Sequence, residues 1–344
     1  MLVSSKSAWG GLALVAAVGG VLFAYWRWSP SRDLPPPDPV ALSTRTAEAV
    51  LPLPPVPDLP PEKVALGKAL FLDPRLSHDN TIACASCHDL LTAGHDKRRY
   101  SVGVGGAVGG VNAPSVFNAA LSFVQFWDGR AASLEEQAAG PVHNPLEMAS
   151  DWKEVLAKLN ADNALVSRFE LVYRQRPSAE NIVDAIATFE RTLLTVNSPF
   201  DRYLRGDEQA IDADAKAGFR LFKDIGCASC HQGANFGGNM FQRFGVMLDY
   251  AQGRPDGKPP TEADLGRFNV THREEDRFVF KVPGLRNVAL TAPYFHDGSV
   301  TRLEDAVAVM GKSQLGRELS ADEIRRLVAF LRTLTGERPA TAAP

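Results

Sequence analysis

The sequence predicts a mainly α-helical body that follows a single apolar N-terminal helix and a proline-rich linker. Helical patterns recur along the 344 residues, whereas strand signals are scarce. A helical pattern also precedes a Cys-x-x-Cys-His stretch twice, which is a weak sign of internal duplication. The length suggests about two domains. The formal net charge of −3 argues against nucleic acid as a partner, because nucleic-acid-binding proteins carry strongly basic patches.

Residues 1–28 are expected to form a membrane anchor or uncleaved signal. Residues 8–26 are uncharged and apolar, and a helix of that length rises roughly 28 Å, about the thickness of a bilayer core. No Ala-x-Ala pattern follows, so an uncleaved anchor is favoured over a removed signal peptide. Residues 29–60 are rich in proline. We expect them to form an extended spacer between the membrane and the body.

The body is expected to begin with a helix whose first residue is a proline. The helical patterns cover residues 61–72, 151–159, 179–194, 212–222, 303–310 and 320–335. Capping-box patterns, Ser133 with Glu136 and Ser320 with Glu323, mark two helix starts. Pro199 and the loop 205–207 indicate a boundary between a first domain, 61–200, and a second, 201–338.

Two stretches have the pattern of a c-type haem attachment site. They contain all four cysteines, Cys84, Cys87, Cys227 and Cys230, and each ends in a histidine, His88 or His231. A lone Cys-x-x-Cys pair is also typical of a zinc knuckle or redox dithiol, but a four-thiolate zinc site would not explain the two histidines. We therefore expect two covalently bound haem c groups. Because haem c is attached outside the bacterial cytoplasmic membrane, the body should face the periplasm.

The order of several motifs resembles that of the bacterial di-haem cytochrome c peroxidases, over about residues 66 to 336. Besides the two attachment sites, the motifs lie at residues 66–71, 112–118, 125–130, 140–148, 285–296 and 308–311. The resemblance implies two cytochrome-c-like helical domains with one haem each, and reduction of hydrogen peroxide to water at the first haem. It also implies electrons entering at the second haem from a small soluble cytochrome c or cupredoxin, a calcium ion between the domains, and a possible homodimer.

The ligand opposite each histidine decides what each haem can do. Met310 lies where the family keeps the methionine ligand of the second haem, and a thioether opposite an imidazole raises the reduction potential. A core methionine is the alternative for this residue. Met240 and Met247 are the fallback ligands, whereas Met148 belongs to the other domain.

The first haem is expected to have an open face. Where well-known family members have a histidine ligand, counted from the motif at 112–118, this sequence has Val104, which cannot ligate iron. His95 and His143 could substitute, although each is otherwise an exposed or locally hydrogen-bonded side chain. We expect a five-coordinate or water-ligated first haem that reacts with peroxide without prior reduction of the second haem.

The resemblance also implies roles for residues around the haems. Glu147 is expected to take and return protons during peroxide cleavage, with Gln137 as its hydrogen-bonding partner. Trp127 is expected to relay electrons between the haems, with core packing as the alternative.

A calcium ion is expected to bind the Asn112 side chain and the backbone carbonyls of Thr291 and Pro293. His296 matches a family position near the second haem. Whether it has a function there or is a buried, hydrogen-bonded histidine is left open.

Two other functions are weighed against the peroxidase. One is a di-haem oxidase of protein side chains, resembling the methylamine-utilisation enzyme, which places a tyrosine opposite the second histidine. Met310 argues against that function, whereas Val104 points mildly towards it. The other is a non-catalytic di-haem electron carrier, against which Glu147 and an open first haem both count.

Overall fold

The computed structural model describes residues 49–249 and 259–343. The predicted anchor and most of the predicted linker lie outside these residues. Within the described ranges, no helix is both long and apolar enough to span a bilayer.

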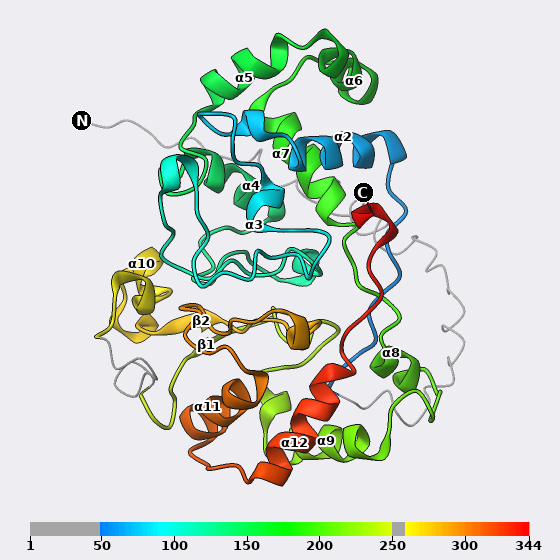
Figure 1. Ribbon diagram of the computed structural model, residues 1–344, viewed down its shortest axis with the longest axis vertical. Helices are drawn as coiled ribbons and strands as arrows, with labels where there is room; N and C mark the ends of the chain where they lie inside the picture. The colour runs from blue at the N-terminus through cyan, green and yellow to red at the C-terminus, as the bar shows by residue number, and fades with distance from the viewer. Residues whose placement is uncertain (1–48, 250–258, 344) are drawn as a thin grey trace, which may run out of the picture. The chain divides into compact units, whose positions relative to one another are not determined.

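Helices dominate the described chain, as predicted (Figure 1). The first half contains α2 (Pro61–Phe71), α3 (Cys84–Cys87), α4 (Leu134–His143), α5 (Trp152–Asn160), α6 (Asn163–Tyr173) and α7 (Ala179–Glu190). The second half contains α8 (Pro199–Leu204), α9 (Ala213–Asp224), α10 (Phe268–Thr271), α11 (Leu303–Leu315) and α12 (Ala321–Arg332). Among the described residues, the one sheet pairs β1 (Phe241–Arg243) with β2 (Val279–Lys281), antiparallel, with Gln242 opposite Phe280.

Side-chain caps begin the predicted helices close to where the sequence places them. The Ser133 hydroxyl accepts a hydrogen bond from the Glu136 amide, and Ser320 and Glu323 form a complete capping box. Two predictions need correction. The helix predicted over 179–194 ends at Glu190, and Pro199, predicted to mark only a domain boundary, begins α8 as its first residue.

The buried apolar side chains form two main clusters, one in each half of the chain. The first includes Leu66, Phe71 and Phe189, and the second includes Phe222, Phe236 and Phe330. Four of the predicted helices build these clusters in two pairs, because α2 packs against α7 and α9 packs against α12. Figure 1 shows α9 and α12 side by side.

The two helix pairs cross in the same way, at a glycine. A Cβ atom on Gly67 would overlap the Ala185 carbonyl oxygen, and one on Gly218 would overlap that of Arg326. Each glycine therefore allows an approach of two backbones that any larger residue would prevent. The same close approach in both halves supports the internal duplication.

A second repeated segment lies after each attachment site. Asn118 and Asn287 both adopt a left-handed conformation, with φ of 62° and 61°, and each precedes a short 3₁₀ turn. An isolated β-bridge follows in each copy, joining Gln125 to Ala131 and Tyr294 to Val300. Residues 112–131 therefore correspond to residues 281–300, which makes Trp127 the counterpart of His296.

The folded body begins before residue 61, contrary to the prediction that residues 29–60 form only a spacer. Val50 belongs to the second apolar cluster, and the Leu53 amide donates to the Asp201 carboxylate. Arg286 is buried in an ion pair with Asp201 (2.8 Å) and also donates to the Leu51 carbonyl. A buried guanidinium needs several acceptors, and the segment 49–53 supplies one of them.

Candidate active site

A cavity of about 310 Å³ lies beside the second attachment site, within the range typical of cofactor pockets. Cys227, Cys230 and His231 line it, and so does Met310 from α11. Figure 1 shows α11 and β2 within the same half of the molecule. The structure therefore brings the predicted attachment residues and the predicted methionine to one cavity.

Both attachment-site histidines have the same ring orientation. The Nδ1–H group of His88 donates to the Gly94 carbonyl (3.3 Å), and that of His231 donates to the Phe236 carbonyl (3.1 Å). Each ring therefore keeps the lone pair of Nε2 for a metal ion. Burial lowers the pKa of both imidazoles, although backbone hydrogen bonds oppose this effect, and the neutral form is the one that binds iron.

The predicted open position of the first haem lies against the predicted proton carrier. The Val104 amide donates to the Glu147 carbonyl (2.9 Å). A Cβ atom on the preceding residue, Gly103, would overlap the Leu146 carbonyl oxygen. The loop that carries Val104 is therefore held directly on the turn that carries Glu147, which ties the two positions together.

The Glu147 carboxyl group is half-buried and held by a neighbour that the sequence did not indicate. The Asn144 side-chain amide donates to Oε1 (2.7 Å), which leaves Oε2 free to carry a proton. Burial raises the pKa of Glu147, although the Asn144 hydrogen bond and the positive charge of Arg130 act in the opposite direction. Asn144 precedes Pro145 in the turn after α4, and nothing in the sequence marked it as a partner.

Three other residues predicted near the first haem are not joined to Glu147 or Val104 by a hydrogen bond among the described residues. Gln137 is half-buried on α4, and among the described residues its side chain makes no hydrogen bond to Glu147. His95 is buried, with Nε2 donating to the Leu290 carbonyl and Nδ1 accepting from the Lys97 amide. His143 is exposed and packs edge-on against Trp152. Both nitrogens of His95 are therefore occupied, and within the described ranges no hydrogen bond joins either histidine to Val104.

Trp127 and His296 face each other where the two repeated segments meet. The centroids of the two rings are 6.3 Å apart, and the rings are arranged edge to face. The Trp127 indole donates to the Asn112 carbonyl (2.8 Å). His296 is buried, stacks on Phe280 and pairs with Asp264 (2.7 Å). His296 is thus a hydrogen-bonded buried histidine, which was one of the two interpretations left open.

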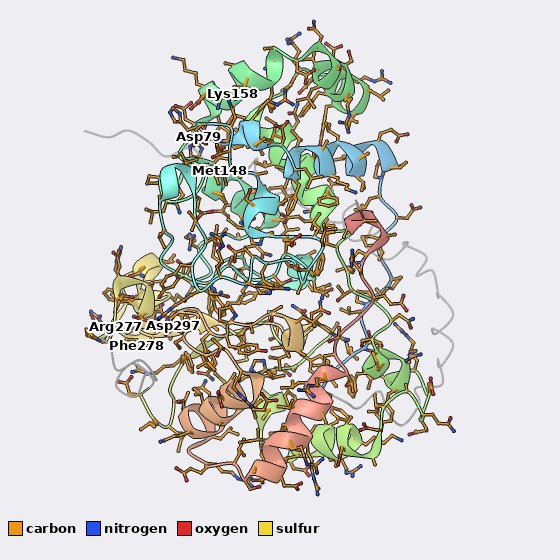
Figure 2. All side chains as sticks on the ribbon, viewed as in Figure 1. Asp79, Met148, Lys158, Arg277, Phe278 and Asp297 are labelled. Carbon is orange, nitrogen blue, oxygen red and sulfur yellow. The ribbon has the colours of Figure 1, made fainter. Side chains whose placement is uncertain are left out.

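Trp127 also belongs to the surroundings of the second cavity. It packs against the same cluster, Phe244 and Phe280, as Met310. The alternative methionines are less suited: Met247 is 63% exposed, and Met148 is buried in the first cluster. Figure 2 shows Met148 among the elements of the first half and Asp297 beside β2. Met240 does not line the cavity among the described residues.

The three predicted calcium ligands line this cavity as well. Asn112 donates through its side-chain NH₂ group to the Arg98 carbonyl (2.8 Å). This bond does not use the Oδ1 atom, which is the side-chain atom that would bind calcium. Within the described part of the chain, the carbonyls of Thr291 and Pro293 accept no hydrogen bond. Carbonyl and amide oxygens without a donor are suitable ligands for calcium.

The donor set fits covalently attached haem better than the zinc alternative. Within the described ranges, no three His, Cys, Asp or Glu side chains gather as a metal cluster, so the four thiols do not form one site. All four cysteines are free thiols. At the second site, two thiols, an imidazole whose Nδ1 is bonded to a carbonyl, and a thioether line the same largely apolar cavity. His88, Cys84 and Cys87 would hold one haem, and His231, Cys227, Cys230 and Met310 the other.

Comparison with known proteins places this chain among related enzymes. Residues 61–209 match the family model described as di-haem cytochrome c peroxidase. The chain is 53% identical over 289 residues to the cytochrome c peroxidase Ccp of Escherichia coli, covering 83% of this chain and 61% of that protein. It is 45% identical to the cytochrome c551 peroxidase of Pseudomonas aeruginosa, covering 81% of this chain and 80% of that protein.

A solved structure gives the same fold. The crystal structure of a MauG-like protein associated with microbial copper homeostasis superposes with a TM-score of 0.73, at 29% identity, covering 86% of this chain and 94% of that chain. The mainly helical fold is thereby confirmed. On its motifs, its fold and its relatives, the chain belongs to the di-haem cytochrome c peroxidase family, whose members are oxidoreductases that act on peroxide.

Proposed function

We propose that this protein reduces hydrogen peroxide to water, with two electrons from a small cytochrome c or cupredoxin and two protons. The observation that carries the proposal is the contact between Val104 and Glu147 beside the first attachment site. This backbone hydrogen bond, from the Val104 amide to the Glu147 carbonyl, joins a residue that cannot ligate iron to the residue that carries a half-buried carboxyl group. A haem held by His88 would supply the redox chemistry at the peroxide oxygen atoms.

Glu147 is the group that moves protons in this proposal. Its Oε2 atom takes a proton from one peroxide oxygen and returns it to the oxygen that leaves as water. Asn144 fixes the other oxygen of the carboxyl group, so the proton-carrying atom has a defined position. The raised pKa favours this role, because a proton carrier works best when its pKa approaches the working pH.

Electrons are proposed to enter at the second site and to pass by way of Trp127. The packing of Trp127 and Met310 against Phe244 and Phe280 supports this route, as does the hydrogen bond from Trp127 to Asn112 in the first repeat. Gln137 is retained as a second polar group near the first haem, without a contact to support it.

Calcium binding at Asn112, Thr291 and Pro293 is also proposed. The ion would join the segment after the first attachment site to the repeat of the second. Because Trp127 donates to the Asn112 carbonyl, removing calcium with a chelator should disturb the tryptophan environment. Trp127 fluorescence or near-ultraviolet circular dichroism that does not change on chelation would contradict this site.

The body is proposed to face the periplasm, tethered by the N-terminal helix, because haem c attachment requires export. Membrane fractionation of the full chain tests the tether. Recovery of all haem protein in the soluble periplasmic fraction, with residues 1–28 absent from its mass, would contradict it.

The decisive experiment is peroxide-dependent oxidation of a reduced small cytochrome by the purified holoprotein. We expect rapid donor oxidation with peroxide and none without it, in a ratio of two donors per peroxide. A pure electron carrier would exchange electrons but show no dependence on peroxide. An oxidase of protein side chains would consume peroxide and modify a protein instead of the donor.

The oxidase is the second candidate, since the MauG-like structure has the same fold. The second cavity favours the peroxidase, because Met310 lines it. Tyr294 lines it too, but the Tyr294 hydroxyl donates to the Val288 carbonyl (3.1 Å). Burial also raises the pKa of Tyr294 to about 12, so the hydroxyl that donates this hydrogen bond keeps its proton.

A further inference from the structure

One lysine in the wall of the second cavity has no charged or hydrogen-bonding partner for its ammonium group among the described residues. Lys281 ends β2, and its backbone amide donates to the Trp127 carbonyl (2.8 Å). Lys281 is one of the residues that line the cavity. Among residues 49–249 and 259–343, no ion pair or hydrogen bond involves its ammonium group. Burial lowers the pKa of Lys281 to about 8, which reflects how poorly this site accommodates an isolated positive charge.

The other charged groups at the cavity are already paired. Arg286 forms its buried ion pair with Asp201, and His296 is bonded to Asp264. Among the described residues, no aspartate or glutamate lines the cavity. The negative charge of Asp128 acts on Lys281 and raises its pKa without reversing the effect of burial. An anionic group bound in the cavity would supply the partner that Lys281 lacks among the described residues, because buried charges are normally paired.

The internal repeat gives Lys281 a counterpart. Lys281 in the second repeat corresponds to Asn112 in the first, and both use their amides across the junction. The Asn112 amide donates to the His296 carbonyl (2.7 Å), just as the Lys281 amide donates to the Trp127 carbonyl (2.8 Å). At equivalent positions, Asn112 offers a cation an oxygen atom, whereas Lys281 supplies a positive charge itself.

We propose that the Lys281 ammonium group pairs with a carboxylate side chain of the haem in the second cavity and thereby raises the reduction potential of that haem. This inference rests on the proposed presence of haem at His231. Haem carries two carboxylates, and a positive charge nearby stabilises the reduced state more than the oxidised state. The hydrogen bond from the Lys281 amide to Trp127 fixes the lysine at the point where electrons are proposed to leave this haem.

Lys281→Met, Lys281→Gln and Lys281→Arg test the inference in the full holoprotein, with Lys312→Met as the matched control. Lys312 is exposed on α11, the helix that carries Met310. The potential of the second haem is measured by spectroelectrochemistry, after mass spectrometry shows two covalent haems and the spectrum shows methionine ligation. We expect the neutral variants to lower the reduction potential of the second haem. At a fixed applied potential, the ratio of reduced to oxidised haem should fall by about tenfold. Lys281→Arg and Lys312→Met should stay close to wild type.

Several results would overturn the inference. One is an unchanged potential in the neutral variants. Another is a Lys281→Arg variant that behaves like the neutral ones, because its charge is retained. A third concerns high pH, where a deprotonated lysine can replace methionine as an iron ligand. If wild type shows such a ligand change, the neutral variants lose it, and their reduction potential at neutral pH is unchanged, then Lys281 is an alternative iron ligand and not a partner of a haem carboxylate. Loss of methionine ligation in both neutral variants but not in Lys281→Arg would support a role for the charge.

The proposed function can fail independently. A holoprotein with two haems that does not oxidise a donor with peroxide would refute the peroxidase, while the shift in potential would still decide the role of Lys281. A wild-type protein without a second covalent haem would overturn both.

Discussion

The two halves of this molecule share a framework and differ in the residues that accompany their attachment sites. Both place a glycine where two helices cross, Gly67 in one and Gly218 in the other. Both tie the Nδ1 atom of the attachment-site histidine to a carbonyl. In the second half, Met310 lines the same apolar cavity as the histidine. The first half places Val104 beside a half-buried carboxyl group, Glu147.

The difference shows how one duplicated scaffold can serve two chemical tasks. A thioether raises the potential of a haem iron and occupies its sixth position, which suits electron transfer. A non-ligating side chain next to a proton carrier suits the binding and cleavage of a small substrate. Backbone carbonyls hold the histidines in the same way in both halves. We therefore attribute the proposed difference in function to Met310 in one half and to Val104 and Glu147 in the other.

The largest effect should come from the shared framework. Gly67→Ala and Gly218→Ala each force a Cβ atom into a carbonyl oxygen of the crossing helix. We expect each to lower the free energy of unfolding by at least ~2–3 kcal/mol, measured by chemical denaturation of the holoprotein. Gly110→Ala is the control, because a Cβ atom there meets nothing within 4 Å. A stable Gly218→Ala with an unstable Gly67→Ala would break the equivalence of the halves.

The next largest effect should be confined to the first half. Glu147→Gln keeps the size of the side chain but removes the proton carrier, so turnover should fall by roughly 100-fold or more. Both haems and the potential of the second haem should be retained. Glu62→Gln, an exposed residue at the start of α2, is the control. Unchanged steady-state turnover in Glu147→Gln would remove Glu147 from the mechanism.

Converting the open face into a closed one tests the asymmetry directly. Val104→His places a potential iron ligand opposite His88, so the fully oxidised enzyme should react with peroxide at least about tenfold more slowly. Stopped-flow mixing of the oxidised protein with peroxide measures this rate. Val108→His, an exposed position in the same loop, should behave like wild type. Equal rates in the two variants would show that residue 104 does not face the iron.

The smallest effect should come from Asn144. Asn144→Ala removes the hydrogen bond that favours the ionised Glu147 and lowers its pKa. Because Glu147 must be ionised to accept a proton, the rate should fall as the pH drops through its raised pKa. In Asn144→Ala that midpoint should move to still higher pH, with about a fivefold loss of turnover, equivalent to ~1 kcal/mol. A pH–rate profile identical to that of wild type would exclude Asn144 as a positioning residue.

The sequence alone determined the features that depend on local chemistry and spacing. The attachment sites, the capped starts of α4 and α12, and the helical character of the body follow from residues close together in the chain. Family motifs pointed to Met310 and Glu147, and the structure brings Met310 to the cavity of His231.

Only the tertiary structure decided what depends on distant contacts. The segment 49–53 looks like a proline-rich spacer, yet it packs because Arg286 needs acceptors from it. Asn144 is recognisable as the partner of Glu147 only once the turn after α4 is formed. The contact of Trp127 with His296 and the position of Lys281 beside Trp127 depend on backbone hydrogen bonds that the two repeats exchange across their junction. Local sequence fixes helices and attachment sites, but contacts between residues far apart in the chain depend on burial and on the pairing of polar groups.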